Sequence, residues 1–242
     1  MTPLQVIETY RGQAFSEGGD ALELDYLPGL TPGEIAKIES ELPCPMPGEL
    51  RDLLGVCSGI EGGLLDWIRF SGDPSAFAMD EVFPNGRAIA GDGCGNFWIV
   101  DLLPSSTAWG PIYFACHDAP VILYQCDSLA VFVEESFRLC LPPNKGLLDD
   151  VSEDRIRQIW DTNPDLVESG APGADPQIAS FASELGAGWF ISDLRAAKPG
   201  DGFSWGRFGP RTEVRRFGDL PIFAYRKPVA KKGFLAGLFG RG

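Results

Sequence analysis

The stretch from Ile89 to Leu102, Ile-Ala-Gly-Asp-Gly-Cys-Gly-Asn-Phe-Trp-Ile-Val-Asp-Leu, constrains the fold more than any other segment of this 242-residue chain. Its three glycines and its asparagine supply the positive-φ positions that a tight turn needs. The aromatic and β-branched residues from Phe97 to Val100 pack well on a pleated surface. The segment therefore predicts a turn that leads into a central strand. Because side chains alternate along a strand, one of the Phe97 and Trp98 rings should lie in the core and the other should face the opposite way.

The glycines at 91, 93 and 95 do not match a ligand-binding loop. A dinucleotide-binding loop has the spacing G-x-G-x-x-G between a strand and a helix, whereas here a strand follows. A calcium loop that began at Asp92 would have Cys94 as its third residue and Phe97 as its sixth, and neither fits. A P-loop ends in Gly-Lys-Ser/Thr, which this sequence lacks. We therefore predict a structural turn and no cofactor.

Composition is typical of a globular protein, since 44% hydrophobic residues suffice for a core. The first residues lack the basic start and apolar run of a signal peptide, and no apolar stretch has the length of a membrane span. We therefore expect a cytoplasmic protein. The six cysteines have no C-x-x-C spacing, and a disulfide would require an oxidising compartment. We expect free, buried thiols at positions 44, 57, 94, 116, 126 and 140.

Charge is distributed unevenly along the chain. Residues 1–150 contain 7 Lys or Arg and 23 Asp or Glu, a net charge of −16, whereas residues 151–242 contain 13 and 11, a net charge of +2. An acidic segment repels nucleic acid and attracts a basic protein, although the same charge also serves plain solubility. The candidate contacts with a basic partner are acids in or near predicted turns, namely Glu61, Asp66, Asp73, Asp80, Glu81, Asp92 and Asp118.

Hydrophobic periodicity predicts an alternation of helices and then strands in the first 140 residues. The expected helices lie at about 3–15, 32–42, 47–57 and 128–137, and the expected strands at 64–70, 97–103, 111–116 and 121–126. Thr31 and Glu34 should form a capping box, and Ser128 should cap the last helix. Residues 16–30 are rich in Gly and Asp and predict a loop. Short connections between the last three strands favour an antiparallel meander.

This order of elements, together with several short motifs, resembles the SMI1/KNR4 (SUKH) superfamily over roughly residues 30–140. The matching pieces are Leu42-Pro43 with Pro47 to Leu54, Ile89 to Leu102, Gly110 to Tyr113, His117-Asp118 and Ser136-Phe137. The resemblance implies an α+β fold, with a small antiparallel or mixed sheet flanked by helices. It also implies a protein that binds another protein and has no catalytic activity. Many bacterial members resemble immunity proteins that block a toxin from a neighbouring cell, and others resemble regulatory scaffolds, as in fungal cell-wall control.

Beyond this region we expect three parts in all, with the family-like domain at 1–145, an appended small α/β subdomain at 146–228 and a flexible tail at 229–242. The subdomain should hold helices from 150 and at 175–185 and short strands at 189–194, 202–208 and 212–225, and should either pack on the first sheet or stand apart. In the tail, Phe234, Leu235, Leu238 and Phe239 share one helical face beside basic residues. That pattern suits weak contact with a membrane surface or a partner groove, and the alternative is a disordered terminus.

The sequence gives no support for a catalytic site. His117 is the single histidine, no G-x-S-x-G elbow exists, and no spacing selects a pair of acids. The basic and aromatic residues between Arg207 and Lys227 suit single-stranded nucleic acid, but a small sheet with a charged outer face shows the same mixture, and we favour the latter. We therefore predict a non-catalytic binding domain without metal or nucleic acid, most simply an immunity protein against a basic toxin. The alternatives are a regulatory interaction scaffold and a hydrolase with acidic residues in a cleft.

Overall fold

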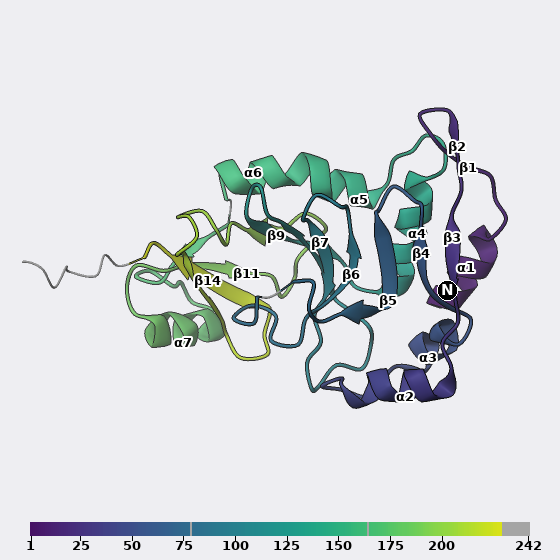
Figure 1. Ribbon diagram of the computed structural model, residues 1–242. Coiled ribbons are helices and arrows are strands. Elements are labelled where there is room, and N and C mark those ends of the chain that lie inside the picture. Colours follow the sequence, from purple (N-terminus) through teal and green to yellow (C-terminus); the bar gives the residue numbers. More distant parts are fainter. Residues whose placement is uncertain (78, 164, 229–242) are drawn as a thin grey trace, which may run out of the picture.

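The fold is built on an eight-stranded antiparallel sheet with the strand order β12-β9-β8-β7-β6-β5-β4-β3 (Figure 1). The computed structural model describes residues 1–77, 79–163 and 165–228. The strands of this sheet are β3 (Asp25–Pro28), β4 (Cys57–Glu61), β5 (Trp67–Asp73), β6 (Arg87–Gly91), β7 (Phe97–Val100), β8 (Ile112–Cys116), β9 (Val121–Cys126) and β12 (Gly202–Phe203). Two smaller sheets accompany it. One is the hairpin of β1 (Phe15–Glu17) and β2 (Asp20–Leu22), and the other has the order β10-β11-β14-β13, with β10 (Val167–Glu168), β11 (Phe190–Asp193), β13 (Glu213–Arg216) and β14 (Ile222–Arg226).

The helices flank these sheets, so the α+β class is confirmed. They are α1 (Pro3–Tyr10), α2 (Pro32–Ser40), α3 (Gly48–Leu54), α4 (Leu129–Leu139), α5 (Leu147–Asp149), the π-helical segment η1 (Asp150–Arg155), α6 (Ile156–Asp161) and α7 (Pro176–Leu185). The predicted caps are confirmed. The Thr31 backbone N–H donates to Glu34 Oε2 over 2.8 Å, and the Val131 N–H donates to Ser128 Oγ over 3.4 Å. These side chains bond N–H groups that the first helical turn leaves without a partner.

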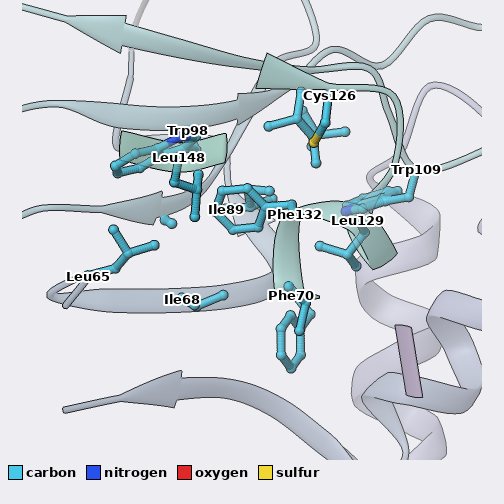
Figure 2. Packing of buried hydrophobic residues seen from close by; sticks show 14 of the residues in the cluster. Leu65, Ile68, Phe70, Ile89, Trp98, Trp109, Cys126, Leu129, Phe132 and Leu148 are labelled. Atoms are coloured by element: carbon cyan, nitrogen blue, oxygen red, sulfur yellow. The ribbon is translucent and has the colours of Figure 1, made fainter. Parts of the chain in front are cut away.

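The central strands are buried on both faces. Trp98 and Phe114 face one hydrophobic cluster, which α1, α3 and α4 cover, whereas their neighbours Ile99 and Tyr113 face a second cluster. Every residue of β8 is buried as a result. Trp98 is 3% exposed and lies in the first cluster, while Phe97 packs against the second, so the prediction for this pair is confirmed. Figure 2 shows the first cluster, with Trp98, Leu148 and Leu65 at one end and Trp109 with Leu129 at the other.

The C-terminal part packs on the large sheet and does not stand apart. The short strand β12 pairs with β9, with Phe203 opposite Ile122. Phe203 stacks on Phe223 of β14, with ring centroids 5.0 Å apart, and both rings lie in the second cluster together with Tyr113. In Figure 1, β14, β11 and α7 form a layer beside the large sheet. The division of the chain at residue 145 stays a prediction, and β12 joins the two parts through one sheet.

A buried ion pair ties the same two parts together. The Arg216 guanidinium of β13 donates to both carboxylate oxygens of Asp101, which follows β7, over 2.9 and 2.8 Å. The two side chains are 4% and 2% exposed. Arg216 also donates to the backbone carbonyl of Val82 over 3.0 Å and lies over the Phe223 ring. These hydrogen bonds run in several directions from one guanidinium group. They therefore hold Arg216 in one geometry at the layer boundary.

Several expected boundaries are wrong, for identifiable reasons. Residues 16–30 hold β1, β2 and β3, because β3 finds its partner in β4, a pairing that local composition does not reveal. The helix expected at 47–57 ends at Leu54, and 57–61 form β4. Gly59 permits this strand, since a Cβ there would lie 2.2 Å from the Ile68 carbonyl oxygen of β5. The segment predicted as a turn that leads into a strand begins at Ile89, but Ile89 to Gly91 belong to the preceding strand β6, and the turn itself spans 92–96.

The expectation of buried cysteines is wrong at one position. All six thiols are free and five are buried, but Cys94 is exposed because it lies in the β6–β7 turn. The tail prediction for 229–242 lies outside the described residues. Within the ranges that the structure describes, no helix combines the length and apolar content that crossing a membrane would require.

We predict that replacing Arg216 by Met destabilises the fold strongly. The substitution leaves the Asp101 carboxylate buried without its cation, which typically costs about 3–5 kcal/mol. The matched control is Arg51→Met, which breaks the exposed pair with Glu39 and should cost at most about 1 kcal/mol. Urea unfolding of the two variants measures the difference. Equal midpoints would show that the Arg216–Asp101 pair does not hold the two parts together.

The deficit of Arg216→Met should also depend on pH. Burial raises the pKa of Asp101 above its ordinary value, against the opposing effect of the Arg216 hydrogen bonds, and loss of the arginine removes that opposition. The folded variant then binds a proton more readily than the unfolded chain, so its stability rises relative to the parent as pH falls. Urea unfolding at pH 8 and at pH 5 should therefore show a smaller loss of unfolding free energy in the variant at pH 5. A deficit that stays constant or grows toward low pH would contradict this account.

Candidate functional site

Three turns project from the same end of the large sheet. The strand register places Glu61 opposite Trp67, Trp67 opposite Gly91, Gly91 opposite Phe97 and Phe97 opposite Ala115. The connections at 62–66, 92–96 and 117–120 therefore emerge side by side. Four of the seven predicted contact acids, Glu61, Asp66, Asp92 and Asp118, lie at this end. We call it the acidic end of the sheet.

Asp92 organises the central turn at the acidic end. Its Oδ1 accepts the backbone N–H groups of Cys94 and Asn96 over 2.8 and 3.1 Å, and its Oδ2 accepts the Asn96 side-chain amide over 2.6 Å. Gly93 and Gly95 have φ of +73° and +91°, which explains why glycine occupies both positions. The turn is thus a fixed platform whose geometry the glycine and asparagine spacing predicts.

Asn96 links this platform to the next turn. Its Oδ1 accepts the backbone N–H of His117 over 3.0 Å, and the His117 ring lies against Gly95. His117 and Asp118 are both exposed, with His117 Nε2 3.2 Å from Asp118 Oδ1. Neighbouring Cys116 is buried in the first hydrophobic cluster, so the thiol and the imidazole do not face a common site.

A cleft of about 380 Å³ opens beside this platform. Its apolar surface comes from Leu64, Leu65, Trp98, Phe114 and Leu139, and its polar residues are Glu17, Asp92, Asn96, Asp149, Ser152 and Glu153. The cleft therefore combines two aromatic rings with four carboxylates. Of the described residues that line it, none is basic. We call this hollow the acidic cleft.

The negative charge in the acidic cleft is not neutralised from within. Burial raises the pKa of Asp149, and repulsion from the Glu153 carboxylate and, to a smaller extent, from Asp150 acts in the same direction, while the Gly146 backbone hydrogen bond and Lys145 oppose the shift. A cation that enters the cleft would relieve this repulsion. The arrangement thus favours a positively charged group with an apolar stem, such as a lysine or arginine side chain, over an anion.

A buried polar chain holds the acidic wall of the cleft in place. Trp98 Nε1 donates to Gln125 Oε1 over 3.0 Å, and Gln125 Nε2 donates to the Leu147 carbonyl over 3.1 Å. The Leu147 N–H in turn donates to Glu135 Oε2 over 2.7 Å. These bonds fix α5, and with it the segment η1 that carries Ser152 and Glu153, against β7 and α4. Single-turn π-helical segments are frequent at functional sites.

The remaining predicted acids lie elsewhere or are already engaged. Glu61, at the acidic end, forms an ion pair with Arg69. Asp73 lies at the far end of β5, where its Oδ1 accepts two hydrogen bonds from Ser75, which lower the pKa of the carboxyl. Asp80 and Glu81 lie in the loop between β5 and β6, part of which packs over the second hydrophobic cluster.

Three of the six basic residues between Arg207 and Lys227 make contacts within the fold. Arg216 pairs with buried Asp101, Arg226 pairs with Glu213, and Arg207 donates to the carbonyls of Trp160 and Asp161. These contacts favour the interpretation of this region as a small sheet with a charged outer face. They disfavour the alternative, a surface that binds nucleic acid. Among the ranges that the structure describes, no group of three or more His, Cys, Asp or Glu residues is placed to hold a metal ion.

Comparison with known protein families supports the motif analysis. Residues 29–135 match the family described as SMI1 / KNR4 family (SUKH-1). This segment is an SMI1/KNR4 (SUKH-1) family domain. It begins just before α2 and runs into α4, and thus contains the acidic end of the sheet. Members of the family are typically toxin immunity proteins, and the family is generally non-catalytic. Neither the curated proteins nor the solved structures gave a match.

Sequence reasoning missed most of the acidic cleft. Glu17 lies in the hairpin that the sequence predicted as a loop, and Asp149 and Glu153 lie beyond the family segment. The available signal is the acid-rich run at 149–154, which on sequence alone predicts the start of a helix. Gln125, the buried residue that positions this wall, carries no sequence signal of its own.

We predict that Gln125→Leu loosens the acidic wall without unfolding the protein. The change leaves the Trp98 indole N–H without a partner and removes one of the hydrogen bonds that the Leu147 carbonyl accepts, a loss of about 1–3 kcal/mol. Hydrogen exchange of 147–155 should become faster, whereas exchange of β4 and β5 should stay unchanged. Unchanged exchange at 147–155 would show that Gln125 does not position this wall.

Proposed function

We propose that this protein binds and blocks a basic protein toxin through the acidic end of the sheet and the acidic cleft beside it. The observation that carries the proposal is the cleft itself, in which four carboxylates and two aromatic rings line one hollow without a basic residue among those described. A lysine or arginine side chain of the partner would lay its stem along the apolar wall at Leu64, which is partly exposed, and place its charge among the carboxylates. Membership of residues 29–135 in a family typical of immunity proteins supports the same role.

The seven predicted acids enter this proposal as two groups. Glu61, Asp66, Asp92 and Asp118 surround the mouth of the interface at the acidic end. Asp73, Asp80 and Glu81 form a separate group away from the acidic end. We expect them to attract the partner through the long-range electrostatic field more than through direct contact. The C-terminal part, 146–228, supports the interface because it contributes Ser152 and Glu153 and covers the opposite face of the sheet.

The kinetics of complex formation test the proposal. The variant Glu17→Gln/Asp149→Asn/Glu153→Gln removes three charges from the cleft, and the control Glu41→Gln/Glu49→Gln/Asp52→Asn removes three exposed charges around α2 and α3. With the product of the neighbouring gene as partner, the cleft variant should slow association by about tenfold at low salt, because steering depends on the local field. The control should change association little, and the difference should shrink as salt rises.

Survival of cells that express the partner is the second readout of the same experiment. The parent protein should protect, and the cleft variant should protect less. Equal effects of the two variants, or no complex with the parent, would overturn the proposal.

A hydrolase remains the second candidate, because acids converge in a cleft and the pKa of Asp149 is raised. Such a combination also occurs in general-acid sites. Turnover of a glycoside or ester substrate by the purified protein, lost in Asp149→Asn but kept in the charge control, would favour the enzyme. Protection from the partner without turnover favours the binding protein. A regulatory scaffold would bind a partner that is not toxic to cells.

A further inference from the structure

The lining of the acidic cleft comes from two different parts of the chain. Its two aromatic residues and one of its carboxylates, Asp92, belong to the segment 29–135 that matches the family. The other three carboxylates lie before or after that segment, at Glu17, Asp149 and Glu153. We call these three residues the flanking acids. Most of the charge in the cleft is therefore supplied from outside the family segment.

The lining from the family segment is committed to the fold. Trp98 and Phe114 are 3% and 1% exposed and belong to the first hydrophobic cluster. Asp92 accepts three hydrogen bonds from Cys94 and Asn96 within its own turn. A substitution at any of these three positions would disturb the core or the turn as well as the cleft. This part of the lining can therefore change little.

The flanking acids carry no such structural duty. Glu17 and Glu153 are exposed, and Asp149 is partly buried. Within the part of the chain that the structure describes, none of the three forms an ion pair. Substitution of an exposed side chain without structural contacts usually changes stability little. The charge pattern of the cleft can thus be altered at Glu17 and Glu153 while the fold stays intact.

Glu17 is nevertheless held in a fixed position. The backbone of its neighbour Ser16 is bonded to the chain at the end of α4, since its N–H donates to the Cys140 carbonyl over 2.9 Å and its carbonyl accepts the Asn144 side-chain amide over 2.6 Å. Phe15 stacks on Phe137 of α4, with ring centroids 5.6 Å apart. The hairpin that carries Glu17 is therefore anchored to α4.

The other two flanking acids are anchored to the same helix. The Leu147 N–H donates to Glu135 Oε2 of α4 over 2.7 Å, two residues before Asp149. Val151, between Asp149 and Glu153, is 1% exposed and belongs to the first hydrophobic cluster. Both walls of the cleft thus keep a fixed spacing, and a partner that matches this spacing binds without first having to order them.

We infer that the flanking acids determine which basic partner this protein accepts, while the family segment supplies the platform on which the partner docks. The inference rests on the proposed function. A partner with Lys or Arg side chains at the matching spacing neutralises the carboxylates. A partner with an acidic or apolar residue at one of these points would leave a carboxylate desolvated without a cation, which is a strong penalty.

Charge reversal separates contact in the cleft from long-range attraction. The variant Glu17→Lys/Glu153→Lys and the control Glu41→Lys/Asp52→Lys change the net charge equally, and all four residues are exposed. With the product of the neighbouring gene as partner, both should associate more slowly than the parent protein. The cleft variant alone should also dissociate at least about tenfold faster, because its lysines face the partner's cations. Thermal unfolding midpoints close to that of the parent protein verify the fold of both.

Selection of changed partners tests the choice of partner directly. Partner variants that stay toxic on their own but are blocked by Glu17→Lys/Glu153→Lys should carry Asp or Glu in place of a Lys or Arg. The parent protein should bind these changed partners at least about tenfold more weakly than the original one.

Two results would overturn the inference and leave the proposed function standing. One is dissociation of the cleft variant at the parental rate, and the other is equal binding of the original and the selected partners by the parent protein. Absence of a complex between the parent protein and the original partner would overturn the proposed function and the inference together.

Discussion

Burial on both faces of β7, β8 and β9 is the constraint on which the rest of the structure depends. Alternate side chains of these strands enter two separate hydrophobic clusters, so the large sheet needs a cover on each side. Helices α1, α3 and α4 supply one cover. The segment that matches the family ends at residue 135 and does not include the other cover, which comes from β12, β14 and the aromatic residues around them. The Arg216–Asp101 pair lies at the boundary between sheet and cover.

Covering both faces leaves the ends of the sheet as the natural place for recognition. Turns between strands tolerate sequence changes that the strands themselves do not, because their side chains project into solvent. At the acidic end the turns are nevertheless well defined, since Asp92 and Asn96 bond the backbone of their own and the neighbouring turn. The C-terminal part adds to this end by placing η1 beside it. A rigid acidic surface with a partly apolar hollow follows from the way the two covers meet the sheet.

Features set by local chemistry could be predicted from the sequence. The capping box at Thr31, the turn at 91–95 and the opposite orientations of Phe97 and Trp98 depend on residues within a few positions of one another. Strand β3 could not be predicted, because it forms only against β4, and the sequence predicts a helix that ends at Cys57 in place of the start of β4. The acidic cleft could not be predicted from the sequence either, because it also depends on contacts between distant parts of the chain. Glu17, Asp92 and Glu153 come from distant parts of the chain and meet only after α4 and α5 pack on the sheet.

The most direct test of the central claim is carbodiimide labelling of carboxyl groups in the free protein and in its complex with the partner. Mass spectrometry then reports how far each acid is shielded. The account predicts strong protection of Glu17, Asp149 and Glu153 in the complex, with labelling of Glu41, Glu49 and Asp52 unchanged. Unchanged labelling of the three cleft acids in a stable complex, or protection confined to the acids around α2 and α3, would contradict it.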